Sequence, residues 1–212
     1  IGLNLEIMAT RDLVFEQACY FVRVLERYGV RFCCIAPGSR STPLTLAFSQ
    51  STVIELVTHF DERGLGFFAV GLAKAKGSPV VVLTTSGTAV GNLFPSVMEA
   101  LHSYVPLLVL TADRPLDQIG IGGNQTIDQL GVFGSFVRSQ ESVVLGEVSD
   151  DFLDRMAGLN KGFRSFFGSP KGPVHVNVHI PEPFTPGSLD KRDLDSCFQV
   201  VLDEVGVDVS EK

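Results

Sequence analysis

Short, uninterrupted runs of apolar and β-branched residues recur along this chain, separated by stretches in which apolar residues follow helical spacing. Such runs are typical of strands that are buried on both faces of a parallel sheet. Strands are predicted at residues 32–35, 53–57, 80–83, 107–110, 142–145 and 174–178. Helices are predicted near residues 14–25, 65–72, 89–102 and 152–163. The alternation predicts a three-layer α/β fold, a parallel sheet of about six strands with helices on both faces.

The composition excludes several classes of protein. Of the 212 residues, 45% are hydrophobic and 19% are charged, which allows a sizeable core. The apolar run at 105–110 is far shorter than the roughly 20 residues that span a bilayer, so no membrane span is expected. A formal net charge of −7 argues against nucleic-acid binding. The cysteines form no C-x-x-C pair, and we interpret them as reduced thiols, with Cys33 and Cys34 on opposite sides of a strand.

The regular spacing of predicted elements ends near Pro181, where prolines and charged residues follow. We therefore expect one domain over residues 1–183, and a linker or the start of another domain over 184–212. The chain begins at Ile1 without a signal-peptide pattern. This start is compatible with a mature form or with a piece of a longer polypeptide.

Ligands of open parallel sheets bind outside the carboxyl ends of the strands, so the loops that leave strands form the candidate site. These loops are residues 37–42, 59–63, 84–88 and 111–115. The glycine-rich stretch 113–134 is predicted to lack regular structure, which is uncommon in a compact domain unless the loop is functional or disordered. Nucleotide phosphate loops and a G-x-S-x-G motif are absent. His175 and His179, about 13 Å apart along a strand, are too distant to share a metal ion and are predicted to be structural.

Two of these loops allow both a structural and a functional interpretation. Asp61 and Glu62 either complement a helix dipole or place a carboxylate at the crevice, where Phe60, Leu65, Phe67 and Phe68 would desolvate it and raise its pKa. The loop 84–88 either caps a helix or uses the same donors to hold a cofactor or a neighbouring subunit.

Arginines follow two of the predicted strands. Arg114 either pairs with Asp113 in a surface turn or joins Arg40 in binding a ligand that carries carboxylates. A helix is expected to begin near Pro43, because proline is tolerated in a first helical turn. From spacing alone, neither alternative for Arg114 is excluded.

Five segments carry a family resemblance, and in chain order they read APGSRSTPLTLA, HFDERGLGFFAVGLAKA, TSGTAVGNL, LTADRP and GGNQTIDQLGVF. Together they resemble the amino-terminal domain of the 2-succinyl-5-enolpyruvyl-6-hydroxy-3-cyclohexene-1-carboxylate (SEPHCHC) synthase family. These are thiamine-diphosphate enzymes of menaquinone and phylloquinone biosynthesis. The resemblance covers about residues 12–183 and implies a pyrimidine-binding domain with a parallel six-stranded sheet.

The resemblance also implies roles for individual residues. Glu62 is expected to be catalytic, because its carboxyl would hydrogen-bond the ring nitrogen of the cofactor's aminopyrimidine and favour the tautomer that deprotonates the thiazolium carbon. A cofactor contact is expected at Glu62, and the functional interpretation of the loop 84–88 adds cofactor contacts at Ser86, Gly87 and Thr88. Substrate contacts are expected at Ser39, Arg40, Arg114, Asn124 and Gln125, and no metal ligand is expected in this chain.

The reaction implied by the resemblance decarboxylates 2-oxoglutarate and adds the succinyl carbanion to isochorismate. Mg²⁺ or Mn²⁺ is expected to hold the diphosphate in a domain with a G-D-G motif, which this chain lacks. That domain would belong to a partner subunit, so we expect a homodimer or homotetramer at full length, and an inactive chain with uncovered apolar surface when alone. The expected compartment is the cytoplasm for a bacterial protein and the plastid for a fused plant or algal one.

Two alternatives remain open at this point. One is another thiamine-diphosphate decarboxylase or carboligase, and Arg40 with Arg114 argues against a monocarboxylate substrate. The other is a noncatalytic interaction domain that retains the fold.

Overall fold

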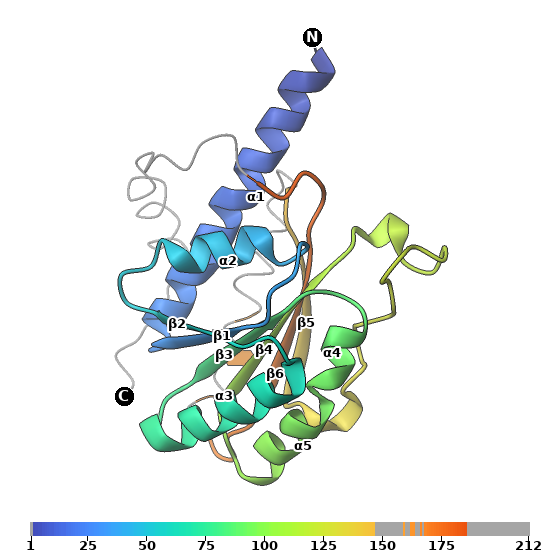
Figure 1. Ribbon diagram of the computed structural model, residues 1–212. Helices are drawn as coiled ribbons and strands as arrows, with labels where there is room; N and C mark the ends of the chain where they lie inside the picture. The colour runs from blue at the N-terminus through green and yellow to red at the C-terminus, as the bar shows by residue number, and fades with distance from the viewer. Residues whose placement is uncertain (1, 147–158, 160–161, 164–165, 167, 186–212) are drawn as a thin grey trace.

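The computed structural model describes residues 2–146, 159, 162–163, 166 and 168–185. Figure 1 shows three layers, with the sheet between α1 and α2 on one face and α3, α4 and α5 on the other. The predicted α/β class with helices on both faces is therefore confirmed.

The sheet has six parallel strands in the order β2-β1-β3-β4-β6-β5, as the apolar runs predict. Their bounds are β1 Phe32–Ile35, β2 Glu55–Thr58, β3 Val80–Thr84, β4 Leu107–Asp113, β5 Ser139–Val144 and β6 Val174–His179. Three boundaries differ clearly from the prediction. β5 begins three residues earlier because Ser139 to Glu141 pair with β6. β2 begins later because the Ser51 hydroxyl accepts the backbone N–H groups of Val53 and Ile54 and holds them in a turn. β4 continues through polar residues predicted as loop, because Thr111 to Asp113 pair with β6.

The helices are α1 Gly2–Arg27, α2 Thr42–Ser49, α3 Glu62–Lys76, α4 Thr88–Asn92 and α5 Phe94–His102, with 3₁₀ turns at Leu116–Gln118 and Gly134–Phe136. The helix expected near Pro43 is confirmed as α2. The single helix expected over 89–102 is wrong: it is two helices with Leu93 between them, and a proline occupies the first turn of α5. Of the helix expected over 152–163, only Leu159 and residues 162–163 lie within the described residues.

Two apolar cores lie on the two faces of the sheet. Cys33 packs in the core beneath α1 and α2, and Cys34 packs in the core beneath α3, α4 and α5, as the alternation of strand side chains predicts. Burial raises the pKa of Cys34 to about 12, so this thiol stays protonated and unreactive. None of the helices within the described residues combines the length and the hydropathy needed to cross a membrane.

The strand order reverses direction at β1, which pairs with β2 on one side and with β3 on the other. Ligands bind at such a reversal, outside the carboxyl ends of the strands. The loops that leave β1 and β3 meet here, because Gly38 lies against the side chain of Thr85. A Cβ atom at Gly38 would overlap Thr85, so the close approach of the two loops requires glycine.

Candidate functional site

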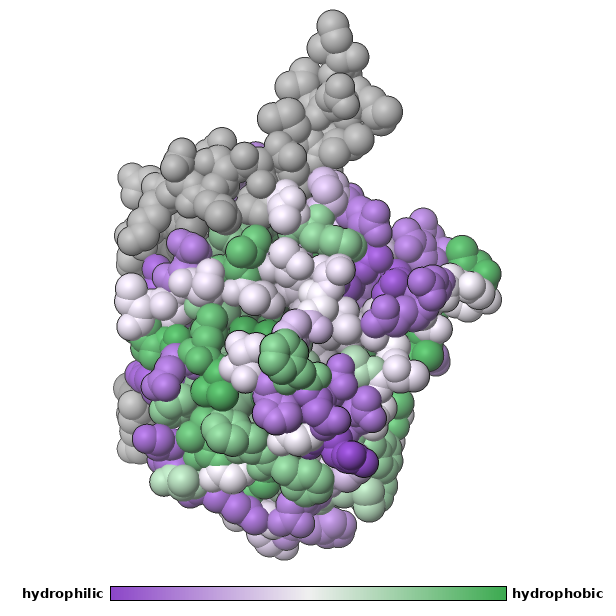
Figure 2. Space-filling view, in the orientation of Figure 1, coloured by the Kyte–Doolittle hydropathy of each residue, from purple (hydrophilic) through white to green (hydrophobic). Residues whose placement is uncertain are grey.

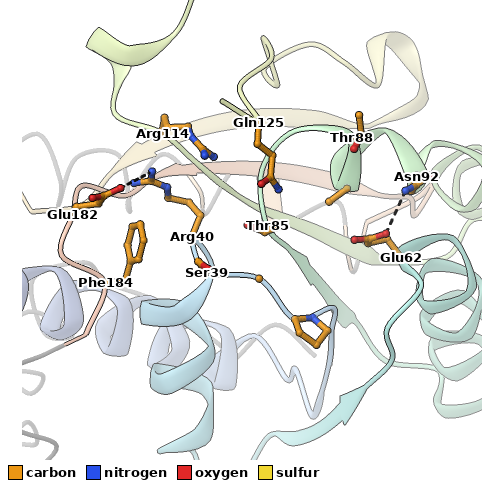
Figure 3. A pocket seen from close by; sticks show the side chains of 13 residues that line it. Ser39, Arg40, Glu62, Thr85, Thr88, Asn92, Arg114, Gln125, Glu182 and Phe184 are labelled. Atoms are coloured by element: carbon orange, nitrogen blue, oxygen red, sulfur yellow. Dashed lines mark hydrogen bonds and ion pairs between the residues drawn. The ribbon is translucent and has the colours of Figure 1, made fainter. Parts of the chain in front are cut away.

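A pocket of about 560 Å³ opens at this reversal, a volume within the range of roughly 300–1,000 Å³ typical of ligand sites. Figure 3 shows residues from the loops after β1, β3, β4 and β6 facing one another across it. The lining residues are Pro37, Gly38, Ser39, Arg40, Glu62, Thr85, Thr88, Ala89, Asn92, Arg114, Gln125, Glu182 and Phe184. The strand-end rule therefore located the pocket correctly.

Arg40 lies at one end of the pocket and is held on three sides. Its Nη1 donates to the carbonyl of Ile180 at 2.8 Å, and its Nη2 donates to Glu182 Oε1 at 3.2 Å. The ring of Phe184 lies 4.5 Å from the guanidinium carbon, a cation–π contact. Burial, followed by the nearby charge of Arg114, lowers the pKa of Arg40, while Glu182 acts in the opposite direction. Arg40 is therefore a largely buried cation whose position is fixed by the chain itself.

Arg114 follows β4 and reaches the same end of the pocket (Figure 3). Its Nη1 donates to Ser86 Oγ. The predicted surface turn with Asp113 is wrong, because the Asp113 side chain is fully buried. Asp113 Oδ1 accepts the backbone N–H of Arg114 at 2.8 Å, and Asp113 Oδ2 accepts from Asn177 Nδ2. The guanidinium of Arg114 is therefore available to the pocket.

Glu62 lies at the opposite end of the pocket, at the first residue of α3 (Figure 3). Asp61 is the N-cap of this helix, and its Oδ1 accepts the backbone N–H of Gly64 at 2.7 Å. The helix-terminus interpretation is thus correct for Asp61. Glu62 Oε2 instead accepts from Asn92 Nδ2 at 3.2 Å across the pocket mouth. The carboxyl of Glu62 is half-buried and faces the cavity.

Within the described part of the chain, the aromatic neighbours of Glu62 do not cover its carboxyl as expected. Phe60, Phe67 and Phe68 are 87%, 46% and 48% exposed, while Leu65 is buried in the core. Helical periodicity explains this, since the buried face of α3 passes through Leu65 and places the two phenylalanines that follow it outside. Figure 2 shows hydrophobic surface on the face where α3 lies in Figure 1. The predicted uncovered apolar surface is present.

One interpretation predicted that a hydroxyl of the loop after β3 caps the following helix, and the structure shows no such cap. Gly87 is the N-cap of α4, with φ of 79°, and the side chain of Gln129 accepts its backbone N–H at 2.9 Å. A Cβ at Gly87 would lie 2.8 Å from Gln125 Cγ, so the loop requires glycine here. Ser86 Oγ donates to the carbonyl of Gln125, and Gln125 Nε2 donates to the carbonyl of Ser86. These bonds tie the loop after β3 to the long loop.

The structure gathers most of the predicted site residues, but not all. Ser39, Arg40, Glu62, Thr88, Arg114 and Gln125 line the pocket. Ser86 and Gly87 are not part of the lining: Ser86 hydrogen-bonds Arg114 and Gln125, and Gly87 donates to Gln129. Asn124 is exposed and also lies outside the lining. The roles proposed for these three residues stay predictions.

Four lining residues lie outside the loops predicted from the sequence, namely Ala89, Asn92, Glu182 and Phe184. Glu182 and Phe184 follow β6, so the strand-end rule applied to the sixth strand would have found them. Asn92 lies within the quoted segment TSGTAVGNL, but no spacing indicated that it faces Glu62.

Residues able to hold a metal ion are not grouped in the part of the chain that the structure describes, where no three His, Cys, Asp or Glu side chains come together. His175 and His179 are both buried and hydrogen-bonded, to Thr111 and Ser142 respectively. The structural role predicted for these histidines is confirmed.

Comparison with known proteins is consistent with this geometry. Residues 16–132 match the family described as "Thiamine pyrophosphate enzyme, N-terminal TPP binding domain". Because the match covers more than half of the chain, the chain belongs to this family of thiamine pyrophosphate (thiamine diphosphate) enzyme domains.

The relatives narrow the class further. The chain is 46% identical over 184 residues to the 2-succinyl-5-enolpyruvyl-6-hydroxy-3-cyclohexene-1-carboxylate synthase of Shewanella amazonensis, covering 84% of this chain and 30% of the relative. The synthases of Renibacterium salmoninarum and Shewanella baltica are 46% and 41% identical, covering 84% and 92% of this chain and 32% and 33% of the relatives. The chain thus spans about a third of these relatives. The predicted resemblance is confirmed.

Proposed function

We propose that this chain is the pyrimidine-binding domain of an SEPHCHC synthase, which decarboxylates 2-oxoglutarate and adds the succinyl carbanion to isochorismate. The observation that carries the proposal is the pocket itself, which has Glu62 at one end and two arginines at the other. Both substrates carry two carboxylates, and guanidinium groups bind carboxylates through paired, charge-assisted hydrogen bonds. A monocarboxylate substrate gives no reason for two arginines in one pocket.

The Glu62 end fits the aminopyrimidine of thiamine diphosphate better than its diphosphate. The described hydrogen-bond partner of Glu62 in the lining is Asn92, and the cations of the lining, Arg40 and Arg114, lie at the opposite end. A carboxyl in this setting can hold or move a proton at a ring nitrogen. When bound, thiamine diphosphate supplies the carbon nucleophile and takes up the electron pair released by decarboxylation. Ligands for Mg²⁺ or Mn²⁺ and the diphosphate are assigned to another domain.

Substrate contacts are proposed at the arginine end. Arg40 and Arg114 bind carboxylates, and Ser39 and Gln125 offer hydrogen-bonding groups at the pocket wall. Asn124, outside the lining, takes part only if its loop changes position around a ligand. In the loop after β3, Thr88 is proposed to contact the cofactor directly, while Ser86 and Gly87 support it from behind.

The proposed active site is shared between subunits. The exposed phenylalanines on and beside α3 support a covering partner surface, which we assign to the diphosphate-binding domain of a second subunit in a homodimer or homotetramer. We retain the proposed domain boundary at Pro183, with residues 184–212 as a linker or the start of another domain; residues 186–212 lie outside the described residues. The compartment, bacterial cytoplasm or plastid, stays a prediction.

The test is an assay of the full-length polypeptide with thiamine diphosphate, Mg²⁺, 2-oxoglutarate and isochorismate, with the product identified by its mass. We expect turnover that requires all four components. Turnover with pyruvate in place of 2-oxoglutarate would favour another decarboxylase or carboligase. Failure of thiamine diphosphate both to support turnover and to raise the Tm would favour a noncatalytic domain.

A further inference from the structure

Gln129 is a fully buried side chain in the long loop between β4 and β5, and it does not line the pocket. The amide of Gln129 forms hydrogen bonds to β6, to β4 and to the loop after β3. Its Nε2 donates to Asn177 Oδ1 on β6 at 2.8 Å and to the carbonyl of Ala112 on β4 at 3.3 Å. Its Oε1 accepts the backbone N–H of Gly87 at 2.9 Å. One amide thus joins two strands to the loop after β3.

The orientation of this amide is set by a buried charge. The carboxylate of Asp113 can only accept hydrogen bonds, so the donor of Asn177 faces it at 2.8 Å. The acceptor of Asn177 consequently faces Gln129, whose own donor must meet it. This leaves the Gln129 acceptor directed at Gly87. Asp113 therefore sets the donor and the acceptor at each hydrogen bond of this series. Flipping the amide of Asn177 or Gln129 would bring two donors or two acceptors face to face.

The series closes into a ring through Arg114. Asp113 Oδ1 accepts the backbone N–H of Arg114, and the Arg114 guanidinium donates to Ser86 Oγ. Ser86 is bonded covalently to Gly87, which returns the path to Gln129. The ring therefore holds the backbone of Arg114 through Asp113 and its guanidinium through Ser86.

We propose that Gln129 is a positioning residue, which holds the Gly87 loop so that Ser86 places the Arg114 guanidinium for a ligand carboxylate. This inference rests on the proposed function, because it assigns Arg114 a dicarboxylate substrate. Gln129 does not line the cavity, and it acts through the Gly87 amide and Ser86. Small displacements of a guanidinium weaken paired hydrogen bonds to a carboxylate because these bonds are directional.

Gln129→Glu separates positioning from simple space filling, because the two side chains have nearly the same shape. A protonated glutamic acid keeps one donor for Asn177 and one acceptor for Gly87, and so preserves the ring. The ionised form has no donor and faces the acceptor of Asn177. Burial and the negative charge of Asp113 raise the pKa of the introduced carboxyl. The other charged or titratable groups near the ring in the described residues include Arg114, which follows β4, Arg40, which follows β1, and His175 and His179 on β6. The wild-type protein also carries all of them.

The experiment measures KM and kcat of the full-length protein for 2-oxoglutarate and for isochorismate between about pH 5.5 and pH 8.5, with each variant divided by wild type. For Gln129→Glu we expect the KM ratio of at least one substrate to rise about 10-fold across this range, with a smaller change in kcat. Gln129→Leu should raise KM at every pH. Gln118→Glu, the same change on an exposed side chain of the same loop, is the matched control and should give a flat ratio. A flat KM ratio for Gln129→Glu would overturn the proposal.

A second measurement keeps the ring testable if the proposed reaction is wrong. Hydrogen exchange of the peptide containing Gly87, followed by mass spectrometry, should accelerate with pH in Gln129→Glu relative to wild type. Accelerated exchange with a pH-independent KM would reject positioning while leaving the proposed function intact. Absence of turnover by the wild-type protein would reject the proposed function, and unchanged exchange would reject the ring.

Discussion

The two ends of the pocket differ in how much of their structure the chain itself supplies. At the arginine end, Arg40 is almost fully buried and is bonded to Ile180, Glu182 and Phe184. At the other end, the carboxyl of Glu62 accepts one hydrogen bond from the described residues, at 3.2 Å, and its donor is the exposed side chain of Asn92. The exposed ring of Phe60 lies two residues before Glu62 in the chain.

The difference indicates which contacts each end still requires. The arginine end is preorganised, so a carboxylate can bind there with little rearrangement of the protein. Among the described residues, the aromatic side chains that precede and follow Glu62 are exposed and leave its carboxyl without apolar cover, and the proposed partner surface would supply that cover. The comparison predicts large functional but small stability effects at Glu62, and effects on both at the arginine end.

The largest expected effect is on turnover at the open end. Glu62→Gln should lower kcat of the full-length protein about 1,000-fold, or about 4 kcal/mol, because it removes a general acid–base group. Its free energy of unfolding should change by less than about 0.5 kcal/mol, since the side chain makes only one exposed hydrogen bond. Glu55→Gln, on the exposed start of β2, is the matched control. Turnover like that of wild type in Glu62→Gln would refute the catalytic assignment.

Beneath the arginine end, the stability should depend on pH. Burial lowers the pKa of His175 to about 4, so the folded protein resists a proton that the unfolded chain binds near pH 6.5. The free energy of unfolding should therefore fall by about 3 kcal/mol as the pH drops from 6.5 to 4, measured by urea unfolding. His175→Gln should remove most of this dependence, whereas His102→Gln, at an exposed site, should retain it. An unchanged pH dependence of the free energy of unfolding in His175→Gln would contradict the assignment of this dependence to the buried His175.

Loss of one cation from the arginine end should weaken substrate binding. Arg114→Ala should lower kcat/KM for 2-oxoglutarate or isochorismate at least about 10-fold, or about 1.4 kcal/mol, through loss of a charge-assisted contact. Arg31→Ala is the control, because Arg31 precedes the amino end of β1, whereas the pocket lies at the carboxyl ends of the strands. Unchanged steady-state constants for both substrates would exclude the proposed role.

A smaller effect is expected from the acid at the same end. Glu182 is 70% exposed, and exposed ion pairs contribute only about 0–1 kcal/mol. Glu182→Gln should therefore lower KM for a dicarboxylate by about 3-fold at most, because Arg40 no longer has an internal carboxylate that competes with the ligand. Weaker binding in this variant would instead assign Glu182 to orienting Arg40.

The smallest effect sharpens the contrast at the open end. Phe60→Ala should change the free energy of unfolding by less than about 0.5 kcal/mol, because this ring is almost fully exposed. Phe133→Ala, at a fully buried ring, should cost about 3–5 kcal/mol in the same urea titration. A large loss of stability in Phe60→Ala would mean that this ring packs within the chain rather than awaiting a partner.

Much of the fold and part of the site were predictable from local pattern. Continuous apolar runs identify strands because both faces of a parallel sheet are buried, and this signal found all six. The strand-end rule then placed Arg40 and Arg114 at one crevice. The polar end of β4 was missed because Asp113 is buried against partners on β6, more than 60 residues away in the chain.

The sequence by itself determined the order of strands and helices, the loops that form the crevice and the charges these loops carry. Only the tertiary structure decided which groups meet: Arg40 with Glu182, 142 residues apart, and Gly87 with Gln129, 42 residues apart. Such pairs have no periodicity, because they depend on strand register and on the packing of loops against one another. Apolar burial is repeated along each element and is readable locally, whereas a single directed hydrogen bond exists only after the sheet has brought its two partners together.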